Sequence, residues 1–199
     1  MKVFVFVMTL QILFVIALSI GSNLYFFEDG SLDVLSYETP VDPYHELTVS
    51  LSKGRFDTNG TNPQYVNEEE NIQKLKGLDN VYEPAQRTGI SYRWDRAFFN
   101  GKYYCYFGIV PVLCMYLPVY LLTGKLISTK ILTLLLVIAT MIMMVKLVIT
   151  IAEKWKKKFN MWIMIAIIIG FINSSFLIFC INGSRFYEVA SVSALLCAI

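Results

Sequence analysis

The stretch Asp95–Gly124, DRAFFNGKYYCYFGIVPVLCMYLPVYLLTG, decides how the rest of the chain is arranged. It begins as a polar loop, becomes apolar at Tyr103 and carries Pro111 and Pro118. A helix needs about 20 apolar residues to span a membrane, so the apolar part, residues 103–122, is long enough to cross. Prolines remove backbone donors and bend helices, which equally permits a segment that lies in the membrane surface. The choice between these two arrangements determines on which side of the membrane every later loop lies.

The composition is that of a membrane protein. Hydrophobic residues make up 56% of the 199 residues and charged residues 16%, against about 25% in an ordinary soluble domain. The four cysteines lie in apolar segments, so we expect buried thiols and no disulfide framework. They are Cys105, Cys114, Cys180 and Cys197. The single histidine, His45, excludes a histidine-rich metal site, and the sequence holds no glycine-rich phosphate loop.

The apolar runs predict an all-α integral membrane protein, a polytopic helical bundle with a large exported loop after its first helix. Residues 1–21 form the first transmembrane helix, with a cleaved signal peptide as the alternative. The extracytoplasmic polar loop takes residues 22–102, and interfacial or re-entrant apolar helices take 103–124. Transmembrane helices follow over 125–199, at about 128–152, 161–181 and an incomplete 186–199. Because the last run is shorter than a span, we expect this chain to be the N-terminal part of a longer protein.

The charge distribution predicts the orientation. Lys2 places the N-terminus in the cytoplasm and the following loop outside. Glu153–Asn160 reads EKWKKKFN. If residues 103–122 cross the membrane, these lysines lie outside, against the positive-inside rule. If residues 103–122 lie in the outer interface, the lysines are cytoplasmic. We therefore expect the second arrangement, in which lysines contact lipid headgroups of the bilayer and no nucleic acid is bound.

Three local structures are expected within the polar loop. The alternation in Glu46–Ser52 predicts a short strand. Arg55–Pro63 contains Asn59-Gly60 and predicts a turn. Glu68–Lys76 has acids at its start and lysines near its end, an order that complements a helix dipole and predicts a short helix.

Three groups of charged residues are candidates for chemistry at the outer face. The adjacent carboxylates Glu28 and Asp29 can accept a proton or bind a divalent cation, with a solvated turn as the alternative. The second group is Arg93, Asp95 and Arg96 in the run RWDR, whose arginines can bind a phosphate bidentately, with a salt-bridge cluster as the alternative. The third group is Arg185 and Glu188, which lie three residues apart, so a helix would place them on one face; the alternative is a surface ion pair.

A family resemblance covers part of these segments. Asn100–Pro111 (NGKYYCYFGIVP), Tyr116–Pro118, Leu121–Gly124 and Ser184–Glu188 (SRFYE) resemble uncharacterised bacterial polytopic membrane proteins. Those proteins are similar to GT-C glycosyltransferases of the protein-mannosyltransferase and aminoarabinose-transferase type. The resemblance implies a large outer loop with helices parallel to the membrane, an acidic motif early in that loop and a polyprenyl-phosphate sugar donor.

The resemblance implies the transfer of a sugar from a polyprenyl-phosphate donor to an extracytoplasmic acceptor. Glu28-Asp29 is the positional match to the family's acidic motif, as base or as metal ligand. Arg93, Arg96 or Arg185 would hold the donor phosphate. The alternative is a non-enzymatic envelope-assembly or scaffold protein with a partner-binding outer loop. A transporter is less expected, because the predicted spans carry almost no ionisable residue besides Lys146.

Overall fold

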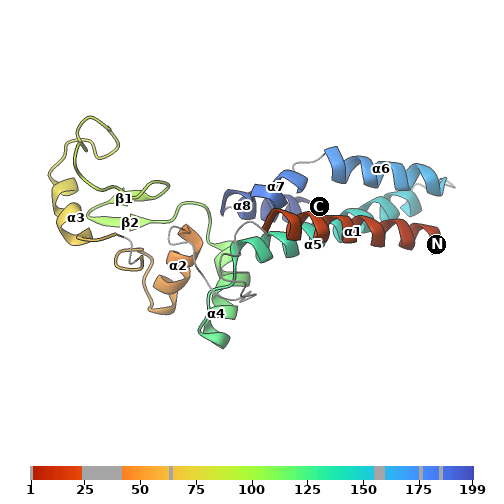
Figure 1. The fold of residues 1–199 in the computed structure, drawn as a ribbon, viewed down its shortest axis with the longest axis horizontal. Helices are drawn as coiled ribbons and strands as arrows, with labels where there is room; N and C mark the ends of the chain where they lie inside the picture. The colour runs from red at the N-terminus through yellow and green to blue at the C-terminus, as the bar shows by residue number, and fades with distance from the viewer. Residues whose placement is uncertain (1, 24–41, 63–64, 155–159, 175–176, 184–185) are drawn as a thin grey trace. The chain divides into compact units, whose positions relative to one another are not determined.

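The computed structural model describes residues 2–23, 42–62, 65–154, 160–174, 177–183 and 186–199. The described chain is mostly helical and contains a single two-stranded sheet (Figure 1). It divides into two compact units. One combines Met1–Val34 with Ser128–Ile199, and the other is Leu35–Ile127. We refer to them as the apolar unit and the loop unit.

The apolar unit consists of helices from both ends of the chain. They are α1 (Lys2–Asn23), α5 (Thr129–Lys154), α6 (Met161–Ser174), α7 (Leu177–Gly183) and α8 (Phe186–Ala198). Helix α5 packs against α8, and α1 packs against α7 (Figure 1). Buried side chains on α5 and α8, among them Leu136, Val137 and Val189, form the contact between these two helices' apolar faces. The helices expected over 128–152 and 186–199 are therefore present. The one expected over 161–181 is described as α6 and α7, and residues 175–176 between them lie outside the described residues.

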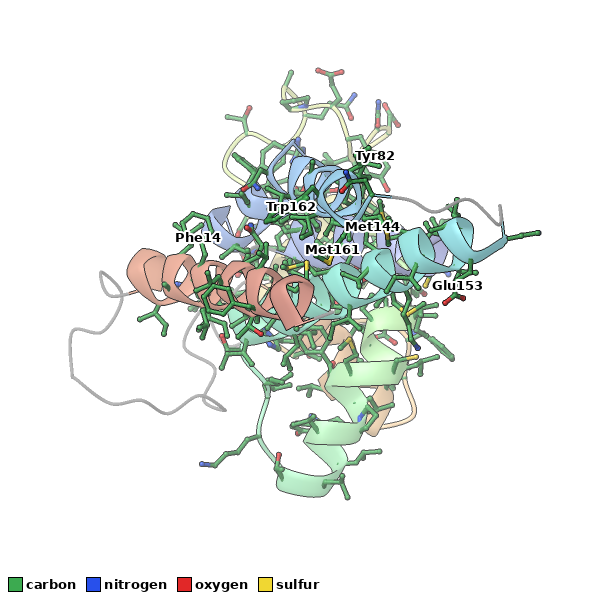
Figure 2. The ribbon with its side chains drawn as sticks, turned by 90° about the vertical axis from the view of Figure 1, so that its right-hand side faces the viewer. Phe14, Tyr82, Met144, Glu153, Met161 and Trp162 are labelled. Carbon is green, nitrogen blue, oxygen red and sulfur yellow. The ribbon has the colours of Figure 1, made fainter. Side chains whose placement is uncertain are left out.

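Helix α5 is the one helix in the described part of the chain that is long and apolar enough to cross a membrane. Its 26 residues extend about 39 Å at 1.5 Å per residue, against a hydrocarbon core of about 30 Å. Leu135 and Ile142 on this helix are 49% and 50% exposed. Figure 2 shows Glu153 near the end of α5, beyond the stretch that carries Met144. Shorter apolar runs cover Phe6–Ile20, Val112–Thr123, Met161–Asn173 and Phe186–Ala198.

The loop unit contains short elements only. They are α2 (Pro43–Ser52), α3 (Glu68–Lys76), β1 (Ala97–Phe99), β2 (Lys102–Tyr104), the π-helical turn η2 (Val112–Tyr116) and α4 (Leu117–Thr123). An apolar cluster of Ile72, Leu75, Phe98 and Tyr103 joins α3 to the two strands. Helix α3 has the bounds that its charges predict, and Asn59-Gly60 forms the expected turn, with Gly60 at a φ of +67°.

The strand predicted over Glu46–Ser52 is wrong, because these residues belong to helix α2. The Asp42 side chain caps the helix by accepting a hydrogen bond from the Tyr44 amide at 2.8 Å. Pro43 occupies the first turn, where its missing N–H has no cost. Threonine is common in strands, but the hydroxyl of Thr48 here donates a hydrogen bond to the Tyr44 carbonyl within the helix. The capping signal thus outweighs the short alternation.

The helices predicted over 103–124 are present only from Val110, so the prediction is wrong for the first residues of this segment. Its first residues belong to β2, which pairs with β1 in a hairpin, with Phe99 opposite Lys102. Asn100 and Gly101 connect the strands with φ values of +48° and +76°, which is the pattern of a type I′ turn. The sequence analysis missed this hairpin, although Asn-Gly between apolar runs is its usual signal.

The helical part of this segment runs from Val110 through η2 to the end of α4 at Thr123. Fourteen residues extend only about 21 Å, which is less than a membrane's hydrocarbon core. Pro118 has no N–H, and the turn before it widens, so that the Leu117 amide donates to the Val112 carbonyl. The helix ends at Gly124 in the left-handed conformation, with a φ of +70°.

The Gly101 position predicts a measurable cost for an added methyl group. In Gly101→Ala the new Cβ would lie 1.9 Å from the Lys76 Cε, in addition to the left-handed strain. Gly89→Ala is the matched control, because Gly89 has a φ of +77° and nothing within 4 Å of its Cβ position. Lys76 is exposed, and the far end of its flexible side chain can move away from the added methyl group at little cost. We therefore expect Gly89→Ala and Gly101→Ala each to destabilise the loop unit by about 1 kcal/mol, through the left-handed backbone alone.

Urea unfolding of the detergent-solubilised chain measures both effects. With Trp155 and Trp162 replaced by phenylalanine, fluorescence reports from Trp94 in the loop unit alone. Adding Lys76→Ala to Gly101→Ala should change the unfolding midpoint little. A loss in Gly101→Ala well above that of the control, recovered by Lys76→Ala, would contradict this expectation and show that Lys76 is held in place.

Candidate functional site

The carboxylate of Glu46 lies at the centre of a buried network in the loop unit. Its Oε2 accepts a hydrogen bond from the Arg96 Nε at 2.8 Å and one from an Arg93 terminal nitrogen at 3.4 Å. Its Oε1 accepts from the Asn62 side-chain amide at 2.8 Å. The Glu46 side chain is 3% exposed. Helix α2 presents it because Asp42 fixes where that helix begins.

Arg93 connects this carboxylate to a second one. Its other terminal nitrogen lies 2.6 Å from the Glu68 Oε1, at the start of α3. The nitrogen facing Glu46 also donates to the Thr58 carbonyl at 2.9 Å. The guanidinium lies over the rings of Tyr65, at 4.3 Å, and Tyr103, at 5.3 Å. The Arg93 side chain is 1% exposed, and it is surrounded by carboxylate, carbonyl and aromatic groups.

The network carries no net charge, because two guanidiniums face two carboxylates. Burial alone lowers the pKa of Arg96, but the hydrogen bond and the charge of Glu46 outweigh it, so the pKa is raised and Arg96 stays cationic. One Arg96 terminal nitrogen donates to the carbonyls of Trp94 at 3.0 Å and Asp95 at 3.4 Å. Both guanidiniums are thus engaged by the protein itself, which leaves neither open to a phosphate.

A small hollow lies beside Arg93. It is lined by Tyr65, Glu68, Asn71, Ser91, Arg93 and Tyr103, and its volume is about 10 Å³. This is the space of about one water molecule. The hollow therefore excludes a sugar or a phosphate group.

His45 is buried on the other side of α2 and joins this helix to the end of the loop unit. Its Nε2 lies 2.8 Å from the Ile127 carbonyl, and its Nδ1 lies 3.5 Å from the Asp42 Oδ2. Tyr116 meets the imidazole edge-on at 5.1 Å between ring centroids. The same tyrosine packs against Tyr44 at 5.7 Å. These contacts hold η2 and α4 against α2.

The predicted site residues fall into three groups. Arg93 and Arg96 are brought together, and they form the salt-bridge cluster that the sequence left as the alternative to a phosphate site. Asp95 lies between them, half-buried, with a φ of +59°. Glu188 is a buried residue of α8 in the apolar unit. The remaining three, Glu28, Asp29 and Arg185, lie outside the described residues.

Sequence reasoning missed Glu46 and Glu68 as partners of the arginines. The excess of acids in the loop predicts that Arg93 and Arg96 are paired, but it does not identify which acids pair with them. Within the described ranges, no three His, Cys, Asp or Glu side chains form a group that could hold a metal ion. All four cysteines are free, but the expectation that they are buried is wrong for Cys114 and Cys197, which are exposed; Cys180 is buried and Cys105 is half-buried.

Comparison with known proteins finds no family model that matches the chain, no similar curated protein and no similar solved structure.

Glu46→Gln tests the energetic role of the network. The substitution removes the charge that compensates two buried guanidiniums, and breaking a buried ion pair costs about 3–5 kcal/mol. We expect a loss of that size in urea unfolding of the loop unit, followed through Trp94 as above. The control is Glu70→Gln, which removes the exposed Glu70–Lys74 pair and should change stability little. Equal midpoints for the two variants would show that the network does not stabilise the unit.

Tyr103 predicts how the loop unit responds to alkali. Burial raises the pKa of Tyr103 to about 12, above the value of about 10 for an exposed tyrosine. Between these values the unfolded chain releases the proton and the folded chain keeps it, so stability falls as pH rises from about 10 to 12. We expect Tyr103→Phe to make this fall shallower. The urea midpoint as a function of pH measures it, and an unchanged slope would contradict the assignment.

Proposed function

We propose that the chain belongs to an integral membrane glycosyltransferase of the GT-C kind, which moves a sugar from a polyprenyl-phosphate donor to an extracytoplasmic acceptor. The proposal combines the resemblance of residues 100–124 with the division of the chain into an apolar unit and an inserted loop unit. In this proposal the N-terminus is cytoplasmic, the loop unit is extracytoplasmic, and α1, α5, α6 with α7, and α8 belong to a polytopic bundle.

The observation that carries the proposal is the exposed face of the helix 110–123. One face packs on α2 through Val112 and Tyr116, which are fully buried. The other face is apolar and open, with Leu121 65% exposed and Leu122 86% exposed. The helix contains no charged residue. Water is a poor environment for such a face, and the surface of a bilayer is a suitable one.

This placement accounts for the direction of the chain after the helix. A helix too short to cross returns the chain to the side it came from, so α5 enters the membrane from outside. Lys154 and the lysines that follow it are then cytoplasmic, as the positive-inside rule requires. The open face of the helix 110–123 supplies an apolar floor for a polyprenyl chain.

The catalytic roles rest on residues outside the described ranges. Glu28 or Asp29 would act as base, or would bind a divalent cation, and Arg185 would hold the donor phosphate. Glu188 is buried in α8, and ionisable residues in apolar helices usually serve a function. Arg93 and Arg96 enter as positioning residues, because Glu46 and Glu68 already occupy their guanidiniums.

A second candidate function is a non-enzymatic envelope protein that binds a partner. Exposed apolar side chains on the loop unit favour it: Phe56 is 65% exposed, and Val66 and Phe99 are each 73% exposed. Such residues are typical of contact surfaces. In this case substitutions at Glu28 and Asp29 would be tolerated, and substitutions at Phe56 or Phe99 would abolish association.

A transfer assay with labelled polyprenyl-phosphate sugars and the full-length protein tests the enzyme proposal. We expect transfer by the wild type and at least a hundred-fold loss in the double variant Glu28→Gln, Asp29→Asn, because general acid–base catalysis contributes about 10²–10⁴-fold. Glu69→Gln with Glu70→Gln is the control, since both are exposed acids of α3. Full activity in the Glu28, Asp29 double variant would remove the proposed role of that pair.

A further inference from the structure

Trp94 is an exposed tryptophan held between two buried arginines. Its side chain is 66% exposed, whereas Arg93 and Arg96 are 1% and 3% exposed. The turn that carries it is fixed, because Arg96 donates hydrogen bonds to the carbonyls of Trp94 and Asp95 while its Nε is held by Glu46. The buried network therefore presents a large aromatic ring to solvent in a defined position.

One face of the Trp94 indole is covered from within the protein. The Arg87 guanidinium lies over this ring at 4.9 Å from the centroid, and over the Tyr92 ring at 4.2 Å. Tyr92 also meets Trp94 edge-on at 6.0 Å. Cation–π contacts of this kind stiffen the ring. Trp94 remains 66% exposed despite these two contacts.

Polar groups accompany this ring. Asp95 follows Trp94 in the chain, and its carboxylate acts electrostatically on the hydroxyl group of Tyr106. Burial, followed by the charge of Asp95, raises the pKa of Tyr106. Tyr106 is itself 56% exposed. We refer to the exposed Trp94, the Asp95 that follows it and the exposed Tyr106, on which Asp95 acts, as the Trp94 patch.

We propose that the Trp94 patch binds a pyranose sugar. The face of an aromatic ring is negative, and it attracts the polarised C–H bonds on the flat side of a sugar ring. The hydroxyl groups at the edge of the sugar can donate charge-assisted hydrogen bonds to the Asp95 carboxylate. The left-handed backbone of Asp95, with a φ of +59°, is held by Arg96 at this place.

Two other occupants fit the Trp94 patch less well. A bilayer surface accepts tryptophan and tyrosine but disfavours an ionised carboxylate between them. A protein partner of ordinary size needs a contiguous apolar surface, whereas Asp95 and Arg87 border this ring. The sugar is the occupant that uses both the ring and the carboxylate. The inference rests on the proposed function for the role of that sugar, as part of the donor or of the acceptor.

Binding can be measured without catalysis. In the full chain with Trp155→Phe and Trp162→Phe, Trp94 is the only tryptophan. We would titrate the detergent-solubilised protein with methyl pyranosides of mannose, glucose, galactose and N-acetylglucosamine. At least one should change Trp94 fluorescence saturably and protect it from acrylamide quenching. Asp95→Asn should weaken this binding about ten-fold or more, while asparagine still tolerates the left-handed backbone.

Controls separate the Trp94 patch from other surfaces. Phe99→Ala removes an equally exposed aromatic side chain of the loop unit and should leave binding unchanged. A variant that keeps only Trp162, an exposed residue of α6, should give no saturable response. No response to any of the four sugars would overturn the inference, as would equal binding by Asp95→Asn. A fluorescence shift with phosphatidylglycerol vesicles in place of a sugar response would assign Trp94 to the bilayer surface instead.

The double variant Glu28→Gln, Asp29→Asn distinguishes this inference from the proposed function. It should bind the same sugar with unchanged affinity even when transfer is lost. Sugar binding in a wild-type protein that shows no transfer would contradict the enzyme proposal and support the Trp94 patch. Transfer without any sugar response at Trp94 would support the enzyme proposal and overturn the patch.

Discussion

The shared carboxylate of Glu46 is the interaction on which the loop unit depends. It receives hydrogen bonds from Arg93 and Arg96, which lie in one stretch of the chain, and from Asn62, which lies in another. Taking an ion out of water costs several kcal/mol unless each charge is paired and hydrogen-bonded. Displacing any one of these stretches would leave a buried charge without its partner. The network consequently specifies one arrangement of α2, the 58–62 turn and the 93–96 segment, where apolar contacts alone would permit several.

The size of the unit explains why such a network is useful. Its apolar cluster joins α3 to the hairpin and does not include α2. Small units bury a modest fraction of their surface, so their cores supply little free energy. Helix α2 instead packs against the helix 110–123, where Tyr44 meets Tyr116. Polar groups hold it as well, with Glu46 on one side and, on the other, His45, whose imidazole meets the Ile127 carbonyl. Hydrogen bonds are directional, so these polar contacts fix the orientation of α2 as well as its position.

Local signals predicted part of this arrangement. The bounds of α3 were predicted from the charges of Glu68–Lys76, and α5 was predicted from the length of its apolar run. Both predictions succeed because each signal lies within the helix itself. The strand over Glu46–Ser52 failed since a cap at Asp42, outside the alternating run, determines the structure. Asn100-Gly101 could have revealed the hairpin. The ion network was out of reach, because Glu46 and Arg96 meet across a large sequence separation that no local pattern encodes.

The burial of Arg93 and Arg96 constrains any chemistry at a phosphate. Three other cations of the loop unit also form ion pairs, since Lys102 and Arg55 both pair with Asp57 and Lys74 pairs with Glu70. Under the proposed function, the donor phosphate would be held outside the buried network, by Arg185 or by a metal ion at Glu28 and Asp29. The Trp94 patch proposed on the loop unit offers an exposed indole and one carboxylate instead of a cation. If both proposals hold, phosphate and sugar would be bound by different parts of the protein, which is the arrangement expected when a lipid-linked phosphate stays at the membrane and the sugar extends from it.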